Sequence, residues 1–466
     1  MDREHVRLAY GKEFVEFDVP RAFLAGPVLD TRKTGASPKP AAEEISEALS
    51  IPFARPKLRE MAAGRCVGIV ISDEFRAGLQ KEIAEALVNE VLAGRPSDLR
   101  VFVATGSHDP AVYARNLKPH VEKLLAGLSV PAKQVLHDCD RSEFVGIGQT
   151  PGGTQVLVNK EWLGTDLRVY GHESKHHYMA GYSTVDKQII PGLSSRRTIE
   201  KNHKNSLDHE NAFAGRSPWH AVESRRFNPF AIDARDGRKL SERHWLSPDG
   251  RLVERAVDTF ALDMVSEKDT IYWVRAGNPD LVTQEMTGVA DKLGAYEVER
   301  TRYVVISPGG PPASQALYGV QNCFDMALKG AIEDGGEALV VAPCNGREDL
   351  PPEVRGLAPD GKSKALFWDN LVRFRDMPLE ACASEIERAF ELYLWKTDRV
   401  LKLLKANRIR MHLFCGLDAG LLESAGFRKA ESIQAWVDER AARGDGKLRV
   451  INNGNKLFVT PVAAGG

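Results

Sequence analysis

The sequence has no excess of charge of either sign. Lysine and arginine number 63 and aspartate and glutamate number 64, which gives a formal net charge of −1 at pH 7. Nucleic acids and anionic membranes attract proteins with a clear basic excess, so this balance gives no electrostatic case for either partner. The sequence also lacks any run of about 18 apolar residues, the length that a transmembrane helix needs. We therefore expect neither nucleic acid nor a membrane among its partners.

Cysteine is scarce and never occurs in a paired motif. The six cysteines are scattered, and the sequence contains no C-x-x-C pair. This distribution is typical of buried thiols in a reducing compartment. The first ten residues, MDREHVRLAY, are charged and lack the apolar segment of a signal peptide. No G-x-G-x-x-G follows a predicted strand, which argues against a conventional nicotinamide-dependent dehydrogenase. These absences predict a cytoplasmic protein.

Predicted strands and helices alternate along most of the chain. Residues 65–72, RCVGIVIS, form an apolar run of strand length, residues 76–94 show helical periodicity, and residues 98–106 form a second strand. This β-α-β order is typical of a parallel sheet. Residues 302–346 repeat the order, and residues 380–406 predict one long charged helix. The sequence therefore predicts an α/β fold with mainly parallel sheets.

The 466 residues are enough for two or three domains. We expect two α/β lobes with a hinge near 270–280 and an active-site cleft between them; one very wide sheet is the less favoured alternative. The N-terminal lobe is predicted to span 1–275 and to be completed by 405–466, and the C-terminal lobe to span 276–404. Residues 216–258 carry many Pro, Asp, Gly and Arg residues with little periodicity, so they predict an insertion or covering segment.

The stretch GHESKHHYMAGYSTVDKQIIPG, residues 171–192, contains a candidate metal motif. Its residues 172–176, HESKH, match the zinc-protease pattern H-E-x-x-H, which needs both histidines on one helix face and the glutamate as general base. Here the motif follows a predicted strand, 166–172, and precedes Gly181, which does not suit a long helix. A zinc-dependent hydrolase, with Glu200 as a possible third ligand, stays an alternative, as does a non-catalytic ligand-binding α/β protein.

Histidines gather in two segments that follow predicted strands. The first, ATGSHDP, presents His108, and the second, residues 172–203, contains Lys187 and several histidines: His172, His176, His177 and His203. The carboxyl ends of neighbouring strands in an open α/β sheet are where ligands bind. Imidazoles there can serve as bases or metal ligands. The sequence therefore favours a histidine-rich site at the sheet edge.

These segments resemble the nickel-pincer-nucleotide-dependent lactate racemases and their 2-hydroxyacid racemase and epimerase relatives. The resemblance lies in TGSH (105–108), in HHYMAGYSTVDKQIIPG (176–192), which is similar to the family's H-F-F-A-G-F-S-G-G-R-K-x-x-x-P-G, and in TIEKNH (198–203). The intervals also agree, with ten residues from His177 to Lys187 and sixteen from Lys187 to His203. Weaker similarity covers most of the chain.

The resemblance implies an isomerase that inverts C2 of a small 2-hydroxyacid by reversible hydride transfer. The implied cofactor is a nickel-pincer nucleotide, pyridinium-3-thioamide-5-thiocarboxylic acid mononucleotide with Ni, attached covalently at Lys187. His203 would be the protein ligand of nickel, and His108 and His177 would be the catalytic bases. Asp73 would bind a cofactor hydroxyl or orient a partner. Cofactor-synthesis proteins would be required partners.

The resemblance also implies a substrate-binding set made of Arg76, Tyr318 and Trp395, with Arg76 holding the carboxylate. This chain departs from the family at two places. The family's S-G-G-R-K reads STVDK (183–187), and the lysine of the lactate racemase pattern Y-Q-x-x-K is Asn322. Losing that cation predicts a substrate other than lactate: malate, an aromatic hydroxyacid or a sugar acid. A displaced arginine could serve a dicarboxylate, the candidates being Arg196, Arg197, Arg225 and Arg226.

Overall fold

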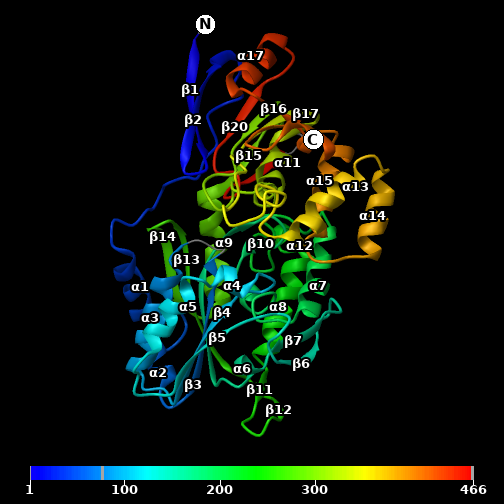
Figure 1. Cartoon of the computed structure of the whole chain (residues 1–466). Helices are drawn as coiled ribbons and strands as arrows, with labels where there is room; N and C mark the ends of the chain where they lie inside the picture. The colour runs from blue at the N-terminus through cyan, green and yellow to red at the C-terminus, as the bar shows by residue number, and fades with distance from the viewer. Residues whose placement is uncertain (1, 75–77, 463–466) are drawn as a thin grey trace. The chain divides into compact units, whose positions relative to one another are not determined.

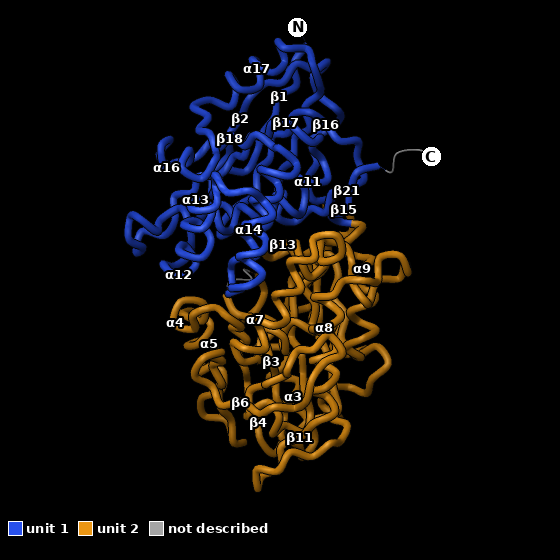
Figure 2. The backbone as a smooth tube through the Cα atoms, turned by 90° about the vertical axis from the view of Figure 1, so that its right-hand side faces the viewer, with its two compact units in different colours: residues 1–32, 293–466 blue, residues 33–292 orange. Residues whose placement is uncertain are grey.

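The computed structural model of the protein describes residues 2–74 and 78–462 (Figure 1). The chain divides into two compact units (Figure 2). Unit 1 consists of Met1–Arg32 and Leu293–Gly466, and unit 2 is the continuous stretch Lys33–Lys292. The fold is α/β in both units, as predicted.

Unit 2 is built on a six-stranded sheet with the strand order β14-β13-β8-β3-β4-β5. Only the edge strand β14 runs antiparallel to its neighbour; the other pairings are parallel. Of the two central strands, β3 (CVGIVIS) is buried and mostly apolar, because both faces of a parallel sheet are covered. The strands are β3 (Cys66–Ser72), β4 (Asp98–Ala104), β5 (Ala132–Leu136), β8 (Leu167–Glu173), β13 (Asp258–Glu267) and β14 (Thr270–Gly277).

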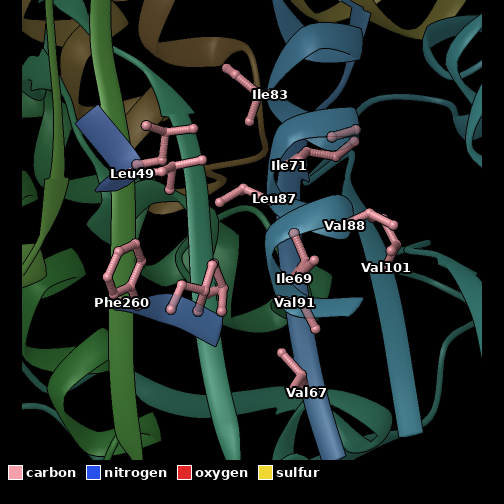
Figure 3. Packing of buried hydrophobic residues seen from close by; sticks show 14 of the residues in the cluster. Leu49, Val67, Ile69, Ile71, Ile83, Leu87, Val88, Val91, Val101 and Phe260 are labelled. Atoms are coloured by element: carbon pink, nitrogen blue, oxygen red, sulfur yellow. The ribbon is translucent and has the colours of Figure 1, made fainter. Parts of the chain in front are cut away.

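The two faces of this sheet carry different layers. On one face, α3 (Gln80–Ala93) buries Ile83, Leu87 and Val91 against Ile69 and its neighbours (Figure 3). The apolar spacing of three and four residues in α3 puts these side chains on one side of the helix. The other face packs against a second cluster that includes Trp162 and the apolar residues around Lys187: Val185, Ile189 and Ile190. The turn that carries Lys187 is therefore anchored in a core.

The remaining elements of unit 2 cover the sheet or extend from it. Its helices are α1 (Ala41–Ser50), α2 (Leu58–Ala62), α4 (Pro110–Tyr113), α5 (Leu117–Leu125), α6 (Lys160–Leu163), α7 (Arg196–Lys204), α8 (Pro229–Ser241) and α9 (Pro279–Gly294), the last ending two residues into unit 1. Three antiparallel hairpins are formed by β6 (Phe144–Gln149) with β7 (Gln155–Asn159), β9 (Lys175–His177) with β10 (Gly181–Ser183), and β11 (His244–Leu246) with β12 (Leu252–Glu254).

Unit 1 has a five-stranded, fully parallel sheet with the order β19-β18-β17-β16-β20. These strands are β16 (Thr301–Ile306), β17 (Ile332–Val341), β18 (Arg410–Phe414), β19 (Arg428–Lys429) and β20 (Leu448–Ile451). The N-terminal hairpin, β1 (Arg3–Tyr10) with β2 (Glu13–Pro20), packs Val6, Leu8 and Phe17 into the same core as Tyr303 and Trp436. A separate parallel pair joins β15 (Ala295–Val298) to β21 (Phe458–Pro461).

The helices of unit 1 are short. They are α10 (Leu317–Val320), α11 (Lys329–Ala331), α12 (Gly361–Lys364), α13 (Asn370–Phe374), α14 (Leu379–Arg388), α15 (Leu394–Leu401), α16 (Ala419–Ser424) and α17 (Ile433–Arg443). The predicted single helix over 380–406 is wrong, because α14 and α15 are separate. Tyr393, between them, has a left-handed backbone conformation with φ of 84°, which a continuous helix does not allow. No helix in the described part of the chain has the length and apolar character needed to cross a membrane.

The unit boundaries differ from the predicted lobes. Residues 405–466 supply β18 and β20 to the sheet that contains β16 and β17, so they belong with 293–404 and not with the N-terminal lobe. The first 32 residues also belong to unit 1. The segment 216–258 is only partly a covering loop, since it contains α8. Its helix start combines Asn228 as N-cap with Pro229 at the first helical position, a pair that also marks loops in a sequence.

Candidate functional site

Lys187 lies on a short 3-10 turn, Val185–Gln188, and its side chain is 6% exposed. Its Nζ is 2.7 Å from His177 Nε2. The same Nζ lies 5.6 Å from the ring centroid of Phe230, a residue of α8. The neighbouring apolar side chains hold this turn against the sheet, so the amine is fixed and largely shielded from solvent.

The hydrogen bonds of His177 indicate which of its nitrogens carries the proton. His177 is the last residue of β9, and its Nδ1 accepts from the backbone N–H of Met179 at 3.4 Å and of Ala180 at 3.3 Å. A neutral imidazole has one N–H, so Nε2 carries the proton and donates it towards Lys187. An ammonium group has no lone pair to accept that bond. This arrangement therefore fits an uncharged Lys187 amine.

His203 is the penultimate residue of α7. Its Nδ1 donates to the carbonyl of Ile199, one turn earlier, at 2.9 Å. The ring meets Phe230 edge-on at 4.9 Å between centroids. Burial is the largest of the causes that lower the pKa of His203, to about 3. His203 is therefore neutral at physiological pH, and Nε2 is the nitrogen with the lone pair.

His108 and Asp73 follow neighbouring parallel strands, β4 and β3. The two strand ends lie at the same edge of the sheet, and His108 Nδ1 is 2.7 Å from Asp73 Oδ2. Asp73 is buried, while about a third of the His108 side chain is exposed (32%). The carboxylate fixes the proton on Nδ1 and leaves Nε2 of His108 as the basic nitrogen. The loop that carries His108 is hydrogen-bonded to the chain just after the turn of Lys187, because Gly106 N–H donates to the Gly192 carbonyl at 3.2 Å. Lys187 and His203 both lie against the Phe230 ring, so the three residues share one neighbourhood.

The structure describes two of the three predicted substrate-binding residues. Arg76 lies outside the described residues. Tyr318, on α10, and Trp395, on α15, both belong to unit 1. The ring of Tyr393 lies between theirs, with centroids 5.8 Å from Tyr318 and 5.6 Å from Trp395. Tyr318 and Trp395 thus share one aromatic cluster within their unit.

A buried lysine beside this cluster was not predicted from the sequence. Lys396 is 2% exposed, and its Nζ donates to Asn322 Oδ1 at 2.6 Å, to the Tyr318 carbonyl at 2.8 Å and to Gln321 Oε1 at 3.1 Å. Burial lowers the pKa of Lys396 to about 7. The segment WKTDR resembles an ordinary charged helix, so nothing in the sequence linked Lys396 to the position of Asn322.

The HESKH motif does not form a zinc site. His172 lies on β8 and is hydrogen-bonded to Ser174 at 3.0 Å, whereas His176 lies on β9 and is paired with Asp291 at 2.9 Å. Burial raises the pKa of Glu173, whose carboxylate accepts from Ser266. Within residues 2–74 and 78–462, the one cluster with metal-ligand geometry is Asp138, Cys139 and Asp140, which shares no residue with the motif. The strand conformation separates side chains that a helix would align, so the zinc-hydrolase alternative is wrong.

Two arginines considered for a dicarboxylate are already paired. Arg196 binds Asp140 through two nitrogens, each at 2.5 Å. Arg225 donates to Asp291 at 2.6 Å. Each guanidinium is thus committed to an aspartate within unit 2.

Known proteins similar to this chain share its sequence pattern and fold. Residues 10–215 match the family described as Lactate racemase N-terminal domain. A lactate racemase of Lactiplantibacillus plantarum is 26% identical over 201 residues, which cover 42% of this chain and 46% of that protein. A lactate racemase of Thermoanaerobacterium thermosaccharolyticum is 24% identical over 347 residues, which cover 73% of this chain and 74% of that protein. The matched region thus spans less than half of the first relative and about three quarters of the second.

Two solved structures have the same fold. The lactate racemase apoprotein of Thermoanaerobacterium thermosaccharolyticum has a TM-score of 0.79 at 20% identity, covering 98% of this chain and 100% of that chain. A Thermotoga maritima protein solved by structural genomics has a TM-score of 0.64 at 13% identity, covering 91% of this chain and 98% of that chain. Residues 10–215 therefore match the lactate racemase N-terminal family, and the chain as a whole has the fold of a lactate racemase apoprotein.

Proposed function

We propose that the protein racemises or epimerises a 2-hydroxycarboxylic acid at C2 by reversible hydride transfer, using a nickel-pincer nucleotide attached at Lys187. The observation that carries the proposal is the grouping of Lys187, His177, His203 and His108 in unit 2. These are the residues that the resemblance to lactate racemases assigns to attachment, nickel ligation and proton transfer. The similarity to two curated lactate racemases supports the reaction class.

The residues present fit such a cofactor. Covalent attachment requires an unprotonated amine, and the hydrogen bond from His177 suits an uncharged Lys187. Nickel ligation requires a neutral imidazole, and His203 has a pKa of about 3 with its Nδ1 bonded to a carbonyl. Lys187 would hold the nucleotide, His203 would bind nickel, and Asp73 would stay paired with His108. When bound, the cofactor supplies reversible hydride acceptance.

The two remaining imidazoles would move the hydroxyl proton. His108 would accept it at Nε2, since Asp73 holds the proton on Nδ1 and stabilises the imidazolium that forms. His177 would perform the same task for the other enantiomer. To accept that proton at Nε2, His177 would carry its own proton on Nδ1, the opposite tautomer to the one that donates to Lys187 in the cofactor-free protein. A reaction that delivers hydrogen to either face of a planar centre needs two such bases.

We also propose a substrate longer than lactate, in keeping with malate, an aromatic hydroxyacid or a sugar acid. Asn322 stands where lactate racemases have a lysine, and its Oδ1 is engaged by Lys396. That bond orients the amide so that Nδ2 points away from Lys396 as a neutral donor. The charge of Lys396 is itself enclosed by Tyr318, Gln321 and Asn322, and so it does not replace the missing cation. Arg76, Tyr318 and Trp395 remain the proposed substrate contacts.

The test is to produce the protein with and without the cofactor-synthesis proteins. We expect the co-produced protein to gain several hundred daltons on the peptide that contains Lys187 and about one nickel per chain, as one covalent ligand set implies. That protein should invert C2 of a malate, phenyllactate or aldonate substrate faster than lactate, and deuterium placed at C2 should stay in the product. Activity without an adduct, or ligand binding without any turnover, would refute the proposal. Fastest turnover of lactate would refute only the substrate class.

A further inference from the structure

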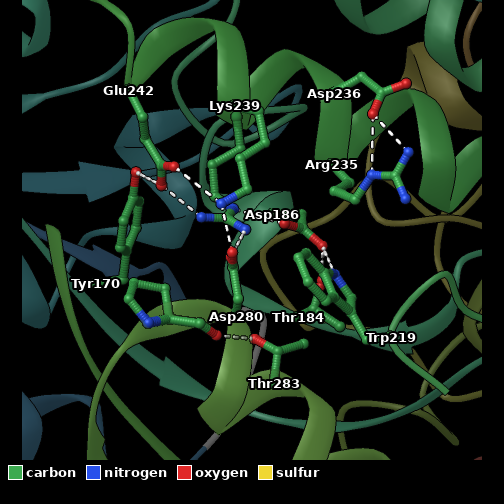
Figure 4. Close-up of polar contacts among 12 residues, drawn as sticks. Tyr170, Thr184, Asp186, Trp219, Arg235, Asp236, Lys239, Glu242, Asp280 and Thr283 are labelled. Atoms are coloured by element: carbon green, nitrogen blue, oxygen red, sulfur yellow. Dashed lines mark hydrogen bonds and ion pairs between the residues drawn. The ribbon is translucent and has the colours of Figure 1, made fainter. Parts of the chain in front are cut away.

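Arg238 is a fully buried cation that contacts three carboxylates. Figure 4 labels these acids, Asp186, Glu242 and Asp280. Arg238 lies on α8, and each of its three guanidinium nitrogens contacts a different acidic side chain. Nε donates to Asp186 at 2.6 Å, Nη2 donates to Asp280 at 2.6 Å, and Nη1 donates to Glu242. Lys239 Nζ also binds Asp280 at 2.5 Å, so that carboxylate has a second cation. Of the three acids, Asp186 is the one that adjoins the candidate site.

Asp186 precedes Lys187 in the same turn, yet the two side chains have different partners. Asp186 Oδ1 faces Arg238, while Oδ2 accepts from Trp219 Nε1 at 2.7 Å and from Thr184 Oγ1 at 3.1 Å. Lys187 Nζ bonds instead to His177. Both carboxylate oxygens are thus engaged by donors, two of which, Arg238 and Trp219, come from the segment 216–258.

Because Asp186 and Lys187 bind different partners, the Asp186 carboxylate does not favour protonation of the Lys187 amine. In a buried setting, a carboxylate within about 4–6 Å of an amine favours the protonated form, and such a pair shifts a titration midpoint by about 1–3 pH units. A released Asp186 is the adjacent anion, with only one peptide unit between its backbone and that of Lys187. A protonated lysine is not a nucleophile. Holding Asp186 elsewhere therefore preserves the reactive state of the amine.

We propose that Arg238 and Trp219 are positioning residues that hold the Asp186 carboxylate away from Lys187 and so keep the Lys187 amine unprotonated and reactive. The proposal deepens the proposed function, on which it rests for the role of Lys187 as attachment point. It gives the segment 216–258 a task in the site beyond covering the sheet. It also explains how an acidic residue is accommodated beside the lysine, at a position where the related pattern S-G-G-R-K has arginine.

The experiment measures the reactivity of Lys187 in the full-length protein without cofactor. Cyanate, a small reagent, carbamylates the neutral form of amines, and peptide mass spectrometry reports the rate at Lys187 across a pH series. Arg238→Gln should move the midpoint of this pH profile upward by about one unit, which slows labelling about tenfold at pH values below the wild-type midpoint. Trp219→Phe removes one hydrogen bond and keeps the ring, and should slow labelling by about threefold in the same direction.

The decisive variants add Asp186→Asn to each of these changes. Removing the carboxylate charge should return the midpoint to the wild-type value in both double variants, and Asp186→Asn alone should leave it there. A merely structural role for Arg238 predicts no such rescue. Arg235→Gln is the matched control on the same helix, because Arg235 binds Asp236 instead of Asp186, and it should not change the profile.

The proposal fails if Asp186→Asn does not restore labelling, or if folded Arg238→Gln and Trp219→Phe proteins label like the wild type. If Arg238→Gln does not fold, the comparison of Trp219→Phe with the double variant Trp219→Phe, Asp186→Asn decides the outcome. Because cyanate reads the lysine without cofactor, the outcome is separate from that of the proposed function. Absence of a nucleotide adduct on Lys187 would refute the proposed function and leave the labelling result intact.

Discussion

Each unit of the molecule encloses one lysine near a proposed site residue, and the two lysines have opposite surroundings. Lys187 in unit 2 meets an imidazole nitrogen, His177 Nε2, at 2.7 Å. Lys396 in unit 1 meets three oxygens at 2.6–3.1 Å. Three acceptors match the three N–H donors of an ammonium group, whereas a nitrogen that donates requires an amine with a lone pair. The hydrogen-bond partners therefore determine the role of a buried amine. Lys187 is suited to reaction, and Lys396 is suited to orienting a neighbouring side chain.

Replacing the nitrogen partner of Lys187 should have the largest effect. A base in proton transfer typically contributes about 10²–10⁴-fold, so His177→Ala should lose at least this much kcat per bound nickel, as should His108→Ala. His176→Gln is the matched control, since His176 neighbours His177 in β9 but pairs with Asp291. Steady-state kinetics normalised to nickel content make the measurement. Equal losses for His176→Gln and His177→Ala would show that the hairpin, and not the base, matters.

Changing one of the oxygen acceptors around Lys396 should alter substrate preference. Asn322→Lys places a second amine against Lys396, and Asn322→Lys with Lys396→Met leaves one amine, at position 322. A charged contact to a carboxylate is stronger than a neutral one by about 1 kcal/mol or more, so the double variant should favour lactate over the larger substrate about tenfold more than the wild type does. The ratio of kcat/KM values from chiral chromatography measures this. Lys396→Met alone should not favour lactate, and an unchanged ratio in the double variant would contradict the assignment of position 322.

The smallest effect concerns stability and pH. Burial lowers the pKa of Lys396 to about 7 from its usual value of 10.5. Between these values the unfolded chain binds more protons than the folded one, so the free energy of unfolding rises with pH by up to about 1.4 kcal/mol per unit. The gain in the free energy of unfolding is complete above pH 10.5, where Lys396 is neutral in both states. This gain is lost as the pH falls towards 7. Urea unfolding of wild type and Lys396→Met across this window should show a flatter slope for the variant, whereas Lys402→Met, which changes a more exposed lysine on the same stretch, should keep the wild-type slope.

Local sequence patterns predicted the strands that position the site. The apolar runs 65–72 and 98–106 became β3 and β4, whose adjacent carboxyl ends bring Asp73 and His108 together. These predictions rest on residues close in sequence, and alternating apolar runs with turn signals define them well. The absence of a helix at HESKH was predicted by the same reasoning, from the preceding strand and Gly181.

The buried charged side chains could not be predicted from local sequence patterns. Arg238 reaches Asp186 across 52 residues, and Lys396 reaches Asn322 across 74. Nothing local distinguishes these residues from solvent-exposed charges, because their burial depends on which elements pack together. The domain boundaries failed for a similar reason. Pairing of β20 with β16 joins segments that are more than a hundred residues apart, and no periodic pattern reports such a pairing.

The parallel contact between β16 and β20 also has a consequence for the order of synthesis. Unit 2 is one uninterrupted stretch, Lys33–Lys292, so a ribosome completes its sequence while more than a third of the chain is still to be made. Residues 1–32 of unit 1 precede unit 2 in the chain, but the sheet of unit 1 lacks an edge strand until β20 is made, and Leu24 and Leu29 form bridges with Leu448 and Ile451. Domains fold as units during translation. The β1–β2 hairpin therefore cannot complete its packing in unit 1 until β20 has been synthesised, after the whole sequence of unit 2.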